Sequence, residues 1–567
     1  MEAQERYNSW LQDPHIDADT KEELRGLADN AAEIEDRFFK WLGFGTGGLR
    51  GTLGAGSNRM NIYTVRLVTQ ALANHLIAQG KAEGGVAIAH DSRRMSPEFT
   101  EAAASVLVAN GIGVYVFPTV APTPLLSYAV RYYKASAGIV ITASHNPPEY
   151  NGYKVYNEHG NQMLTDEALS ISSQMAKLGL DNVLVDPNPK ENALWRWIDE
   201  DVIESYYQRL LEIAPQTDST EHLRILYTPL HGTGGRFVPE ILRRAGFSKV
   251  STLEEQMIPD GNFPTVDYPN PEDPKAFQLA FAKTKDEPCD LIIATDPDAD
   301  RMGVAVYHGG DWVLLSGNQV GVLLSDFLLS NLEPAQAGRS VVIKTIVTTE
   351  MVQPIAAKYG AEVRSTLTGF KYIGTLMDHL PMEHKEFVFG FEESYGYLAG
   401  TAVRDKDAIV ASLLVCQVAA HYQKQGLTLV DRLEQLFAEH GYYLQDLVSY
   451  SFATSREAER SRAFIRQLEH QPITSIGSEP VVEVLNYGKG IHLDLRSRQK
   501  TTIRLPREGV LQWITANGSK VTLRPSGTEP KMKLYVEVKG TNREDAQKRL
   551  LAIKEAFNEL VEAGLRG

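Results

Sequence analysis

The segment A-G-I-V-I-T-A-S-H-N-P-P-E-Y-N-G-Y-K, residues 137–154, joins an apolar run to a turn rich in polar residues. The apolar run Ala137–Thr142 predicts a buried strand, and the two prolines that follow it exclude a helix. Ser144 is therefore expected on a fixed loop at the mouth of the strand, where an α/β sheet usually presents its site. His145 is adjacent, and Lys154 can fold back toward the serine as a cation.

Helix-like and strand-like segments alternate on both sides of this loop. A helix is expected over Glu22–Leu42 and another over Asn61–Ala78, followed by a strand at Val86–Ala89. The alternation restarts near Leu223 and again near Gly317. Such alternation is typical of α/β domains.

After about Tyr442 the pattern changes to short alternating segments and a closing helix at Asn542–Ala563. The sequence therefore predicts three similar α/β domains with mixed sheets and a smaller C-terminal α+β domain. Their expected ranges are 1–205, 206–314, 315–440 and 441–567.

The composition limits the classes of function. The chain has 567 residues, 43% of them hydrophobic, which is enough for several cores. Its 57 Lys and Arg against 72 Asp and Glu give a net charge of −15, which argues against broad binding to nucleic acid or an anionic membrane. Cys289 and Cys416 are the only cysteines, so neither a disulfide scaffold nor a cysteine metal cluster is expected, and a reducing cytoplasm fits. Neither a secretory signal nor a membrane span is expected.

A second motif, T-D-P-D-A-D-R (residues 295–301), lies between two apolar runs and predicts a tight loop between strands. Asp296, Asp298 and Asp300 place carboxylates at alternate positions, where they can converge on one hard cation. The glycine and glutamate that an EF-hand needs later in its loop are missing. Because carboxylates so close repel one another, a cation would stabilise them. The alternative is an ordinary acidic turn.

Two further motifs predict binding of a phosphate and of a sugar. L-R-P-S-G-T-E-P-K-M-K, residues 523–533, pairs a Ser-Gly-Thr turn with Arg524 and two lysines, and the backbone N–H groups of such a turn can hold an anion. G-F-E-E-S-Y-G-Y, residues 390–397, offers carboxylates, a hydroxyl and aromatic rings that suit sugar hydroxyls. The alternative for both is a solvated surface turn, and for Ser144 a turn whose side chains only bond the backbone.

Two glycine-rich segments resemble motifs of other enzymes. Gly43–Gly48 matches the dinucleotide spacing G-x-G-x-x-G, but it follows a helical pattern instead of a strand, so a phosphate or substrate loop is the remaining interpretation. His231-Gly-Thr-Gly-Gly resembles the oxyanion loop of lipases, yet no serine of this chain has glycine at both −2 and +2. Neither a dinucleotide site nor a serine hydrolase is expected.

Taken together, the four motifs resemble the α-D-phosphohexomutase family, in the family's order, from about Gly45 to Lys533. The resemblance implies four domains around a central cleft, which contribute in turn a phosphoserine loop, a metal loop, a sugar loop and a phosphate loop. It implies an intramolecular phosphotransferase of the isomerase class that acts on small sugar phosphates.

The resemblance also assigns roles at matching positions. It implies a phosphate carrier and catalytic neighbours at Ser144, His145, Lys154, Arg50 and Lys406. Lys406 would accept a proton if its pKa were lowered. One Mg²⁺ per chain would be held by Ser144, Asp296, Asp298 and Asp300. Substrate contacts are implied for Arg301, Thr368, Gly369, Glu392 and Ser394. A phosphate seat is implied for Arg524, Ser526, Gly527 and Thr528.

The choice of sugar depends on smaller details. T-L-T-G-F-K-Y-I-G (residues 366–374) and P-N-P-E (269–272) resemble family members that interconvert α-D-glucose 1-phosphate and glucose 6-phosphate, with glucose 1,6-bisphosphate as activator and intermediate. F-E-E-S-Y-G-Y (391–397) resembles a branch that includes phosphopentomutases, so phosphomannomutase and phosphopentomutase activity are alternatives. A metal-dependent sugar phosphatase and a non-catalytic sugar-phosphate sensor are rival functions. The oligomeric state is left open.

Overall fold

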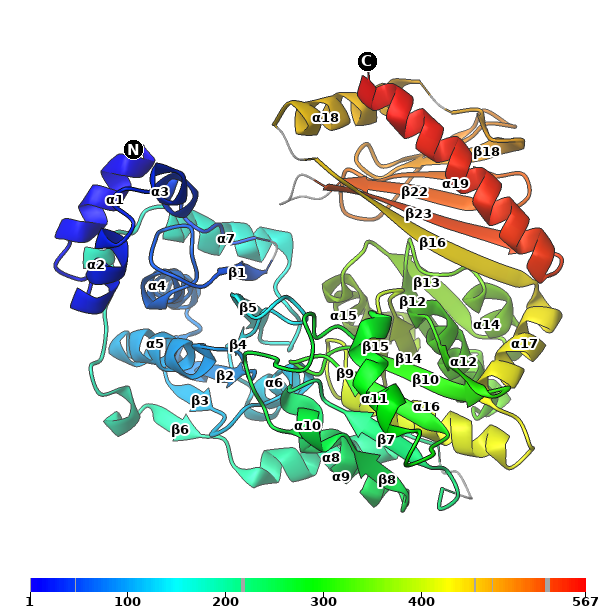
Figure 1. Ribbon diagram of the computed structural model, residues 1–567, viewed down its shortest axis with the longest axis horizontal. Coiled ribbons are helices and arrows are strands. Elements are labelled where there is room, and N and C mark those ends of the chain that lie inside the picture. The colour runs from blue at the N-terminus through cyan, green and yellow to red at the C-terminus, as the bar shows by residue number, and fades with distance from the viewer. Residues whose placement is uncertain are drawn as a thin grey trace. The chain divides into compact units, whose positions relative to one another are not determined.

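The computed structural model describes residues 2–45, 47–215, 220–452, 455–471, 473–525 and 531–566 (Figure 1). The chain forms two compact units. The first comprises Met1–Asn331 and Phe370–Leu429, and the second comprises Leu332–Gly369 and Val430–Gly567.

A six-stranded mixed sheet lies in the N-terminal part of the first unit, with strand order β1-β5-β4-β2-β3-β6. The pairs β4–β2, β2–β3 and β3–β6 are parallel, whereas β4–β5 and β1–β5 are antiparallel. Helices α4, α5 and α7 share a core with the sheet, and α6 contacts β2 and β4. The strands are β1 (Gly48–Thr52), β2 (Val86–His90), β3 (Val114–Val116), β4 (Ala137–Ile141), β5 (Tyr150–Asn157) and β6 (Trp195–Trp197). The helices are α4 (Ile62–Ala78), α5 (Ser96–Ala109), α6 (Thr123–Tyr133), α7 (Thr165–Met175) and α8 (Glu200–Ile213).

Local capping explains where these helices begin. The Asn61 side chain accepts hydrogen bonds from the N–H groups of Tyr63 and Thr64 at 3.1 and 3.0 Å, so α4 starts at the next residue, as predicted. The prediction of a single helix over Glu22–Leu42 is wrong. The chain instead forms α1 (Ala3–Gln12), α2 (Ala18–Arg25) and α3 (Ala31–Phe38), because Asn30 caps a new helix by accepting from Glu33 N–H at 3.1 Å.

A five-stranded mixed sheet follows, in the order β11-β10-β9-β7-β8. β9 pairs parallel with β7 and antiparallel with β10, which places the aspartate motif in the turn between β9 and β10. The strands are β7 (Ile225–Thr228), β8 (Val250–Thr252), β9 (Leu291–Thr295), β10 (Met302–His308) and β11 (Asp311–Leu314). The helices are α9 (Phe237–Arg244), α10 (Glu254–Met257) and α11 (Gln278–Lys283).

The third α/β region contributes to both units. In the first unit it supplies α12 (Gly317–Ser330), α15 (Phe370–His379), the antiparallel pair β14 (Glu386–Phe391) and β15 (Tyr397–Ala399), and α16 (Ala408–Gln423). In the second unit it supplies α13 (Pro334–Ala337), α14 (Val352–Tyr359) and the parallel pair β12 (Ser340–Thr345) and β13 (Glu362–Thr366). Helix α16 is largely buried, and the Asp407 side chain caps it by accepting hydrogen bonds from the N–H groups of its first turn.

The C-terminal part of the second unit is an antiparallel sheet with strand order β16-β23-β22-β21-β18-β19-β20. Helix α19 covers it over a core that contains the fully buried Trp513. The strands are β16 (Tyr442–Ser451), β17 (Ser475–Ile476), β18 (Glu479–Asn486), β19 (Ile491–Asp494), β20 (Lys500–Thr502), β21 (Leu511–Thr515), β22 (Lys520–Pro525) and β23 (Lys531–Gly540). The helices of this unit also include α17 (Leu429–His440), α18 (Ser455–His470) and α19 (Arg543–Arg566).

The predicted fold class is confirmed: α/β regions with mixed sheets precede a smaller α+β region. Among the described residues, no helix combines the length and the apolar character that crossing a membrane requires.

Two lysines are buried in the second unit. Lys344 and Lys520 are 0% and 4% exposed, and both contact Glu350 Oε1, at 2.8 and 2.7 Å from their Nζ atoms. Lys344 also donates to the carbonyl oxygen of Thr348 at 3.2 Å. Burial, together with the charge of Lys520, lowers the pKa of Lys344 to about 8, although Glu350 opposes this shift.

The lowered pKa predicts a pH-dependent effect of Lys344→Met. Between pH 8 and 10.5 the unfolded chain keeps a proton that folded Lys344 has released, so this lysine adds stability to the wild type as pH rises. The variant lacks this gain, and its free energy of unfolding should fall relative to the wild type across the window. Urea unfolding followed by tryptophan fluorescence measures the difference. Lys358→Met, which removes a surface pair with Glu439, is the control and should show no such trend; a constant difference for Lys344→Met would contradict the shifted pKa.

Candidate active site

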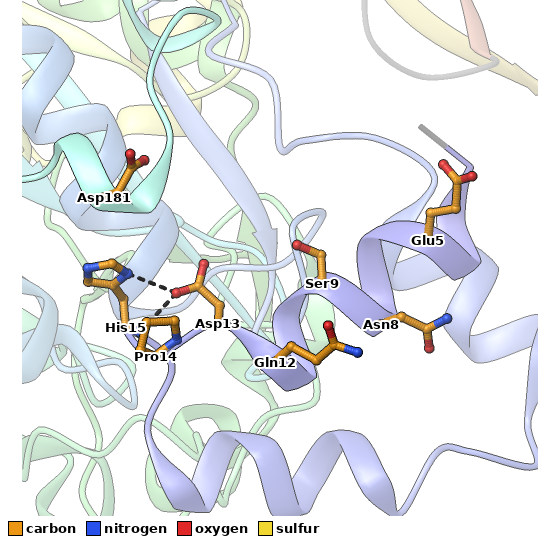
Figure 2. Close-up of a pocket in the computed structure, with 8 residues that line it drawn as sticks. All are labelled: Glu5, Asn8, Ser9, Gln12, Asp13, Pro14, His15 and Asp181. Carbon is orange, nitrogen blue, oxygen red and sulfur yellow. Dashed lines mark hydrogen bonds and ion pairs between the residues drawn. The ribbon is translucent and has the colours of Figure 1, made fainter.

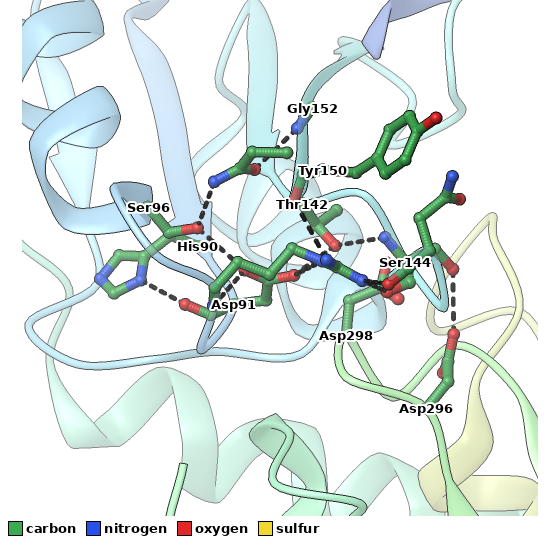
Figure 3. A network of polar contacts seen from close by, with 12 residues as sticks. His90, Asp91, Ser96, Thr142, Ser144, Tyr150, Gly152, Asp296 and Asp298 are labelled. Atoms are coloured by element: carbon green, nitrogen blue, oxygen red, sulfur yellow. Dashed lines mark hydrogen bonds and ion pairs between the residues drawn. The ribbon is translucent and has the colours of Figure 1, made fainter. Parts of the chain in front are cut away.

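Ser144 lies in the loop between β4 and β5 and has a backbone φ of +53°. Its Oγ donates to Asp296 Oδ2 at 2.9 Å, and its N–H donates to the hydroxyl of Thr142 at 2.8 Å (Figure 3). A non-glycine residue keeps a positive φ only where its surroundings hold it there. The serine is thus fixed in a strained turn that faces the aspartate loop.

The aspartate loop turns tightly between β9 and β10, with Ala299 at φ +49°. Asp296, Asp298 and Asp300 are buried, and each offers an oxygen within 4.8 Å of the other two. The N–H groups of Asp300 and Arg301 donate to Asp296 Oδ1 at 3.0 and 2.9 Å, which holds the carboxylate at the start of the loop.

The donor set of this loop fits a metal ion. The Oδ1 atoms of Asp298 and Asp300 are buried and have no hydrogen-bond partner among the described residues. Buried carboxylate oxygens without partners are costly, and oxygen atoms at this spacing are the ligands that hard divalent cations prefer. The buried trio can therefore bind a metal ion.

Two lysines balance the charge of the aspartates. The chain folds back from Ser144 as strand β5, which carries Lys154 to within 2.8 Å of Asp298 Oδ2 and 3.4 Å of Asp300 Oδ2. Lys406, just before α16, lies 3.2 Å from Asp300 Oδ2. These contacts bring residues from three regions of the sequence to one cluster.

Burial and charge set different protonation tendencies within the trio. Burial, and then the charges of Asp298 and Asp300, raise the pKa of Asp296 well above its usual range. Burial also opposes ionisation of Asp298, but Lys154 outweighs it and lowers that pKa. For Asp300, burial and the charge of Asp298 oppose ionisation, yet Lys406 and Lys154 lower its pKa.

Proton acceptance by Lys406 was expected only if its pKa were lowered, and in this structure the pKa is raised. Burial alone would lower it, but Asp300, Asp405 and Glu392 outweigh burial and raise the pKa. With these carboxylates around it, the raised pKa favours the protonated form of Lys406, which can neutralise charge and donate a hydrogen bond. The sequence did not reveal how many carboxylates would surround it.

Two arginines and a neutral histidine border the cluster. Arg301 donates to Glu272 Oε1 at 2.6 Å, and Arg50 on β1 donates to Asn146 Oδ1 at 3.1 Å in the Ser144 loop. Burial, followed by the charges of Arg301 and Arg50, lowers the pKa of His145 well below its usual value, so this imidazole is uncharged. Its buried Nδ1 has no hydrogen-bond partner among the described residues.

The sugar-loop motif forms the turn between β14 and β15. Glu392 N–H donates to the Gly396 carbonyl oxygen at 2.9 Å, and Met302 N–H donates to the Tyr395 carbonyl oxygen at 3.1 Å, which docks the turn beside the aspartate loop. Burial raises the pKa of Glu392 to about 7, although Lys406 opposes the shift. Ser394 is half-buried on the same turn.

Gly396 lets this turn approach Lys406. A Cβ atom at Gly396 would lie 2.3 Å from Lys406 Cδ, too close for any side chain. Gly396→Ala should therefore displace Lys406 and lower kcat by about tenfold, in line with a loss of about 1.4 kcal/mol of transition-state stabilisation. Steady-state kinetics measures the change. Gly43→Ala is the control, since its Cβ would meet no atom within 4 Å; equal kcat values for both variants would contradict the proposed contact.

The remaining predicted site residues belong to the second unit or fall outside the described residues. Thr368 and Gly369 belong to the second unit. Arg524, also in the second unit, lies 3.4 Å from Glu508 through its Nη2 atom. Ser526, Gly527 and Thr528 fall outside the described residues, so their role stays a prediction.

A surface pocket in the first unit lies elsewhere. It is lined by residues of α1 and the following loop and by Asp181, which comes from a separate segment of the chain (Figure 2). His15 and Asp13, which pair at 2.8 Å, line it too. The pocket shares no residue with the Ser144 cluster.

Sequence reasoning missed three residues beside the site. Asp91 and Arg93 follow β2 and contact the Ser144 loop, and Thr123 donates to Asp298 Oδ2 at 2.7 Å. A signal was available for the first two, because H-D-S-R-R follows a fully buried strand that is parallel to β4. Polar residues at the ends of neighbouring parallel strands meet at one edge of a sheet.

The strained serine and the buried carboxylate trio both lie in loops that follow sheet strands, which is typical of an α/β enzyme, and the trio suits a divalent metal. Models described as phosphoglucomutase/phosphomannomutase α/β/α domains I, II and III match residues 42–181, 204–309 and 316–439. The chain belongs to the phosphoglucomutase/phosphomannomutase family, which confirms the resemblance found in its motifs.

Curated relatives agree with this assignment, and solved structures agree with the fold. A phosphoglucomutase of Staphylococcus epidermidis is 36% identical over 503 residues, covering 88% of this chain and 90% of the relative. One from Staphylococcus aureus is 35% identical over 540 residues, covering 94% and 96%. The structure of pp63/parafusin from Paramecium has a TM-score of 0.70 at 18% identity and covers 92% of this chain and 95% of that one. A putative phosphomannomutase from Thermus thermophilus has a TM-score of 0.68 at 24% identity, covering 92% and 98%. These two structures support the fold.

Proposed function

We propose that the protein is a phosphoglucomutase that interconverts α-D-glucose 1-phosphate and glucose 6-phosphate through a phosphoserine and a bisphosphorylated sugar. The contact of Ser144 Oγ with Asp296, inside a cluster that also contains Lys154 and Lys406, carries this proposal. The names of the relatives support glucose as the sugar.

Two transfers account for the reaction. In the first, the bond between phosphorus and Ser144 Oγ breaks, a bond forms from phosphorus to the free hydroxyl oxygen of the sugar monophosphate, and the proton of that hydroxyl ends on Ser144 Oγ; the second transfer returns a proton from the serine to the sugar oxygen. The bisphosphate then presents its other phosphate, which passes to Ser144 Oγ and leaves the isomeric monophosphate. Phosphate is conserved overall, and the enzyme ends phosphorylated, as it began.

The residues around Ser144 suit this transfer because phosphoryl transfer depends mainly on positioning and on neutralisation of charge. Lys154, Lys406 and Arg301 supply positive charge beside the serine. Neutral His145 can form a hydrogen bond without adding charge. Glu392, with a pKa near 7, can bind a sugar hydroxyl in either protonation state.

Ser144, Asp296, Asp298 and Asp300 would hold Mg²⁺, in line with the two carboxylate oxygens of the loop that have no hydrogen-bond partner among the described residues. When bound, the ion supplies positive charge to the phosphate oxygens. Glucose 1,6-bisphosphate is proposed as the activator, because it can phosphorylate an unmodified serine.

Several finer predictions from the sequence remain proposals. These are the four domain ranges, the phosphate seat at Arg524 and residues 526–528, and a cytoplasmic location. Two buried, unpaired cysteines support the last of these.

A coupled assay tests the function. Glucose 1-phosphate, Mg²⁺ and glucose 1,6-bisphosphate should yield glucose 6-phosphate, detected as NADPH through glucose-6-phosphate dehydrogenase. Mannose, glucosamine and ribose 1-phosphates, assayed in parallel, rank the alternative sugars. Release of inorganic phosphate in place of isomerisation would indicate a phosphatase, and binding without either reaction would indicate a sensor.

A further inference from the structure

Arg93 is buried against the loop that carries Ser144. It is 1% exposed, although it is charged and follows the end of β2. Its two terminal nitrogens donate to backbone carbonyl oxygens of the loop and of the start of β5. The acceptors are Ser144 at 2.6 Å, Asn146, Pro147 at 2.8 Å and Tyr150 at 3.0 Å. One guanidinium group thus holds most of the backbone that turns around the serine.

Asp91 joins Arg93 to the other support of the loop. Its Oδ2 lies 3.4 Å from Arg93 Nε and accepts a hydrogen bond from the Thr142 hydroxyl at 2.6 Å (Figure 3). The same hydroxyl oxygen accepts the N–H of Ser144. Asp91 is fully buried, and its Oδ1 accepts from the Arg93 N–H and the Ser96 hydroxyl, both at 2.9 Å. The ion pair of Asp91 and Arg93 therefore supports the backbone of Ser144 both at its N–H group, through Thr142, and at its carbonyl oxygen.

The segment 258–265, which belongs to the region of the second sheet, packs against the Arg93 guanidinium. The Arg93 guanidinium lies 5.0 Å from the centre of the Phe263 ring, a cation–π contact. Gly261 lies so close that a Cβ there would be 2.4 Å from Arg94 N. The second region thus packs directly on the residues after β2.

The same segment is connected to the aspartate loop. The His231 ring contacts the Ile258 carbonyl oxygen at 3.1 Å and the Thr265 hydroxyl at 2.9 Å, one at each end of the segment. Two residues later, Thr233 N–H donates to the Pro297 carbonyl oxygen at 2.8 Å, within the aspartate loop. The H-G-T-G-G motif therefore braces both the segment over Arg93 and the loop that carries the metal ligands.

We propose that Arg93 is a positioning residue for phosphoryl transfer: held between Asp91 and Phe263, it fixes the backbone of residues 144–150 so that Ser144 Oγ meets the aspartate loop. This inference rests on the proposed function. Arg93 acts through the loop backbone, because its terminal nitrogens donate to carbonyl oxygens of the loop. Lysine cannot replace it, because a compact ammonium group lacks the planar fork of donors that reaches several carbonyls at once.

Arg93→Lys tests the proposal. A loop displaced by about 1 Å costs about 10²-fold in rate, so kcat should fall by about 100-fold while KM for glucose 1-phosphate changes by less than about threefold. Hydrogen exchange of the amides of residues 143–150 should accelerate in the purified full chain, whereas the amides of β4 should not.

Arg59→Lys is the matched control. Arg59 is also a buried arginine of the same unit that contacts a carboxylate, Asp36, and backbone carbonyls. Its replacement should lower the thermal midpoint without changing kcat or the exchange of residues 143–150. A purely structural role for Arg93 would make the two variants behave alike, and that result would overturn the proposal.

Phe263→Leu is a second variant that tests the same proposal if Arg93→Lys does not fold. It removes the ring face but keeps an apolar side chain, and should lower kcat by about fivefold and accelerate exchange in the same loop. Normal kcat and normal loop exchange in this variant would overturn the proposal. Hydrogen exchange does not require turnover, so it tests the role of Arg93 in the loop even if the protein has no mutase activity. Absence of mutase activity in the wild type would contradict only the proposed function.

Discussion

Ser144→Ala is expected to abolish turnover of glucose 1-phosphate, with a loss of at least about 10⁴-fold in kcat, because no other oxygen lies in its place to carry the phosphate. The fold should survive. Serine and alanine meet the same backbone strain at this φ, and the lost hydrogen bond to Asp296 is worth only about 1 kcal/mol. The coupled assay and a thermal unfolding curve, measured on the same preparation, separate the two effects.

Ser105→Ala is the control for this experiment. Ser105 is a buried serine of the same unit that donates to the Asp186 carbonyl oxygen at 2.6 Å, remote from the cluster. Its replacement should cost stability and leave kcat unchanged. Intact mass measurement adds a direct observation: incubation with glucose 1,6-bisphosphate should add one phosphate to the wild type and to Ser105→Ala, but none to Ser144→Ala. Turnover that persists in Ser144→Ala would refute the phosphoserine mechanism.

Asp298→Asn is expected to weaken binding of Mg²⁺ or Mn²⁺ strongly and to lower kcat by about 10³-fold, since several kcal/mol of charge stabilisation depend on the metal site. The amide keeps the shape of the side chain but removes the charge that pairs with Lys154. Calorimetric titration with Mn²⁺ measures the binding without requiring activity.

Asp286→Asn is the matched control, because Asp286 is an exposed carboxylate shortly before β9. Its replacement should leave both the titration and kcat unaltered. If Asp298→Asn binds Mn²⁺ as the wild type does, the aspartate loop is not the metal site, whatever happens to its activity.

The sequence was most informative where a short apolar run ends in a polar motif. β4 and β9 were both predicted from such runs, and the residues that follow them, Ser144 and Asp296, do come together. The reason is physical: a buried strand must be apolar, and its end is where polar groups can meet without disturbing the core. The same rule applied to β2 would have identified Asp91 and Arg93.

Other features depend on contacts that no local pattern contains. The burial of Arg93 could not be predicted locally, because the carbonyl groups that accept its hydrogen bonds lie more than 50 residues further along the chain. The direction of the Lys406 pKa could not be predicted from the sequence, because it depends on Asp300 and Glu392, which belong to turns elsewhere in the chain. The break between α2 and α3 was missed because Asn30 was not recognised as a helix cap.

The hydrogen bond between Ser144 and Asp296 joins residues 152 positions apart, and the one between Thr123 and Asp298 joins residues 175 apart. Contacts of such high sequence separation form late, because a long loop must close before they add any stability. During folding, each sheet can therefore assemble while the serine and the carboxylates are still apart. Appearance of high-affinity Mn²⁺ binding in a refolding experiment should accordingly lag behind the recovery of secondary structure, and would report the moment at which the two sheets dock.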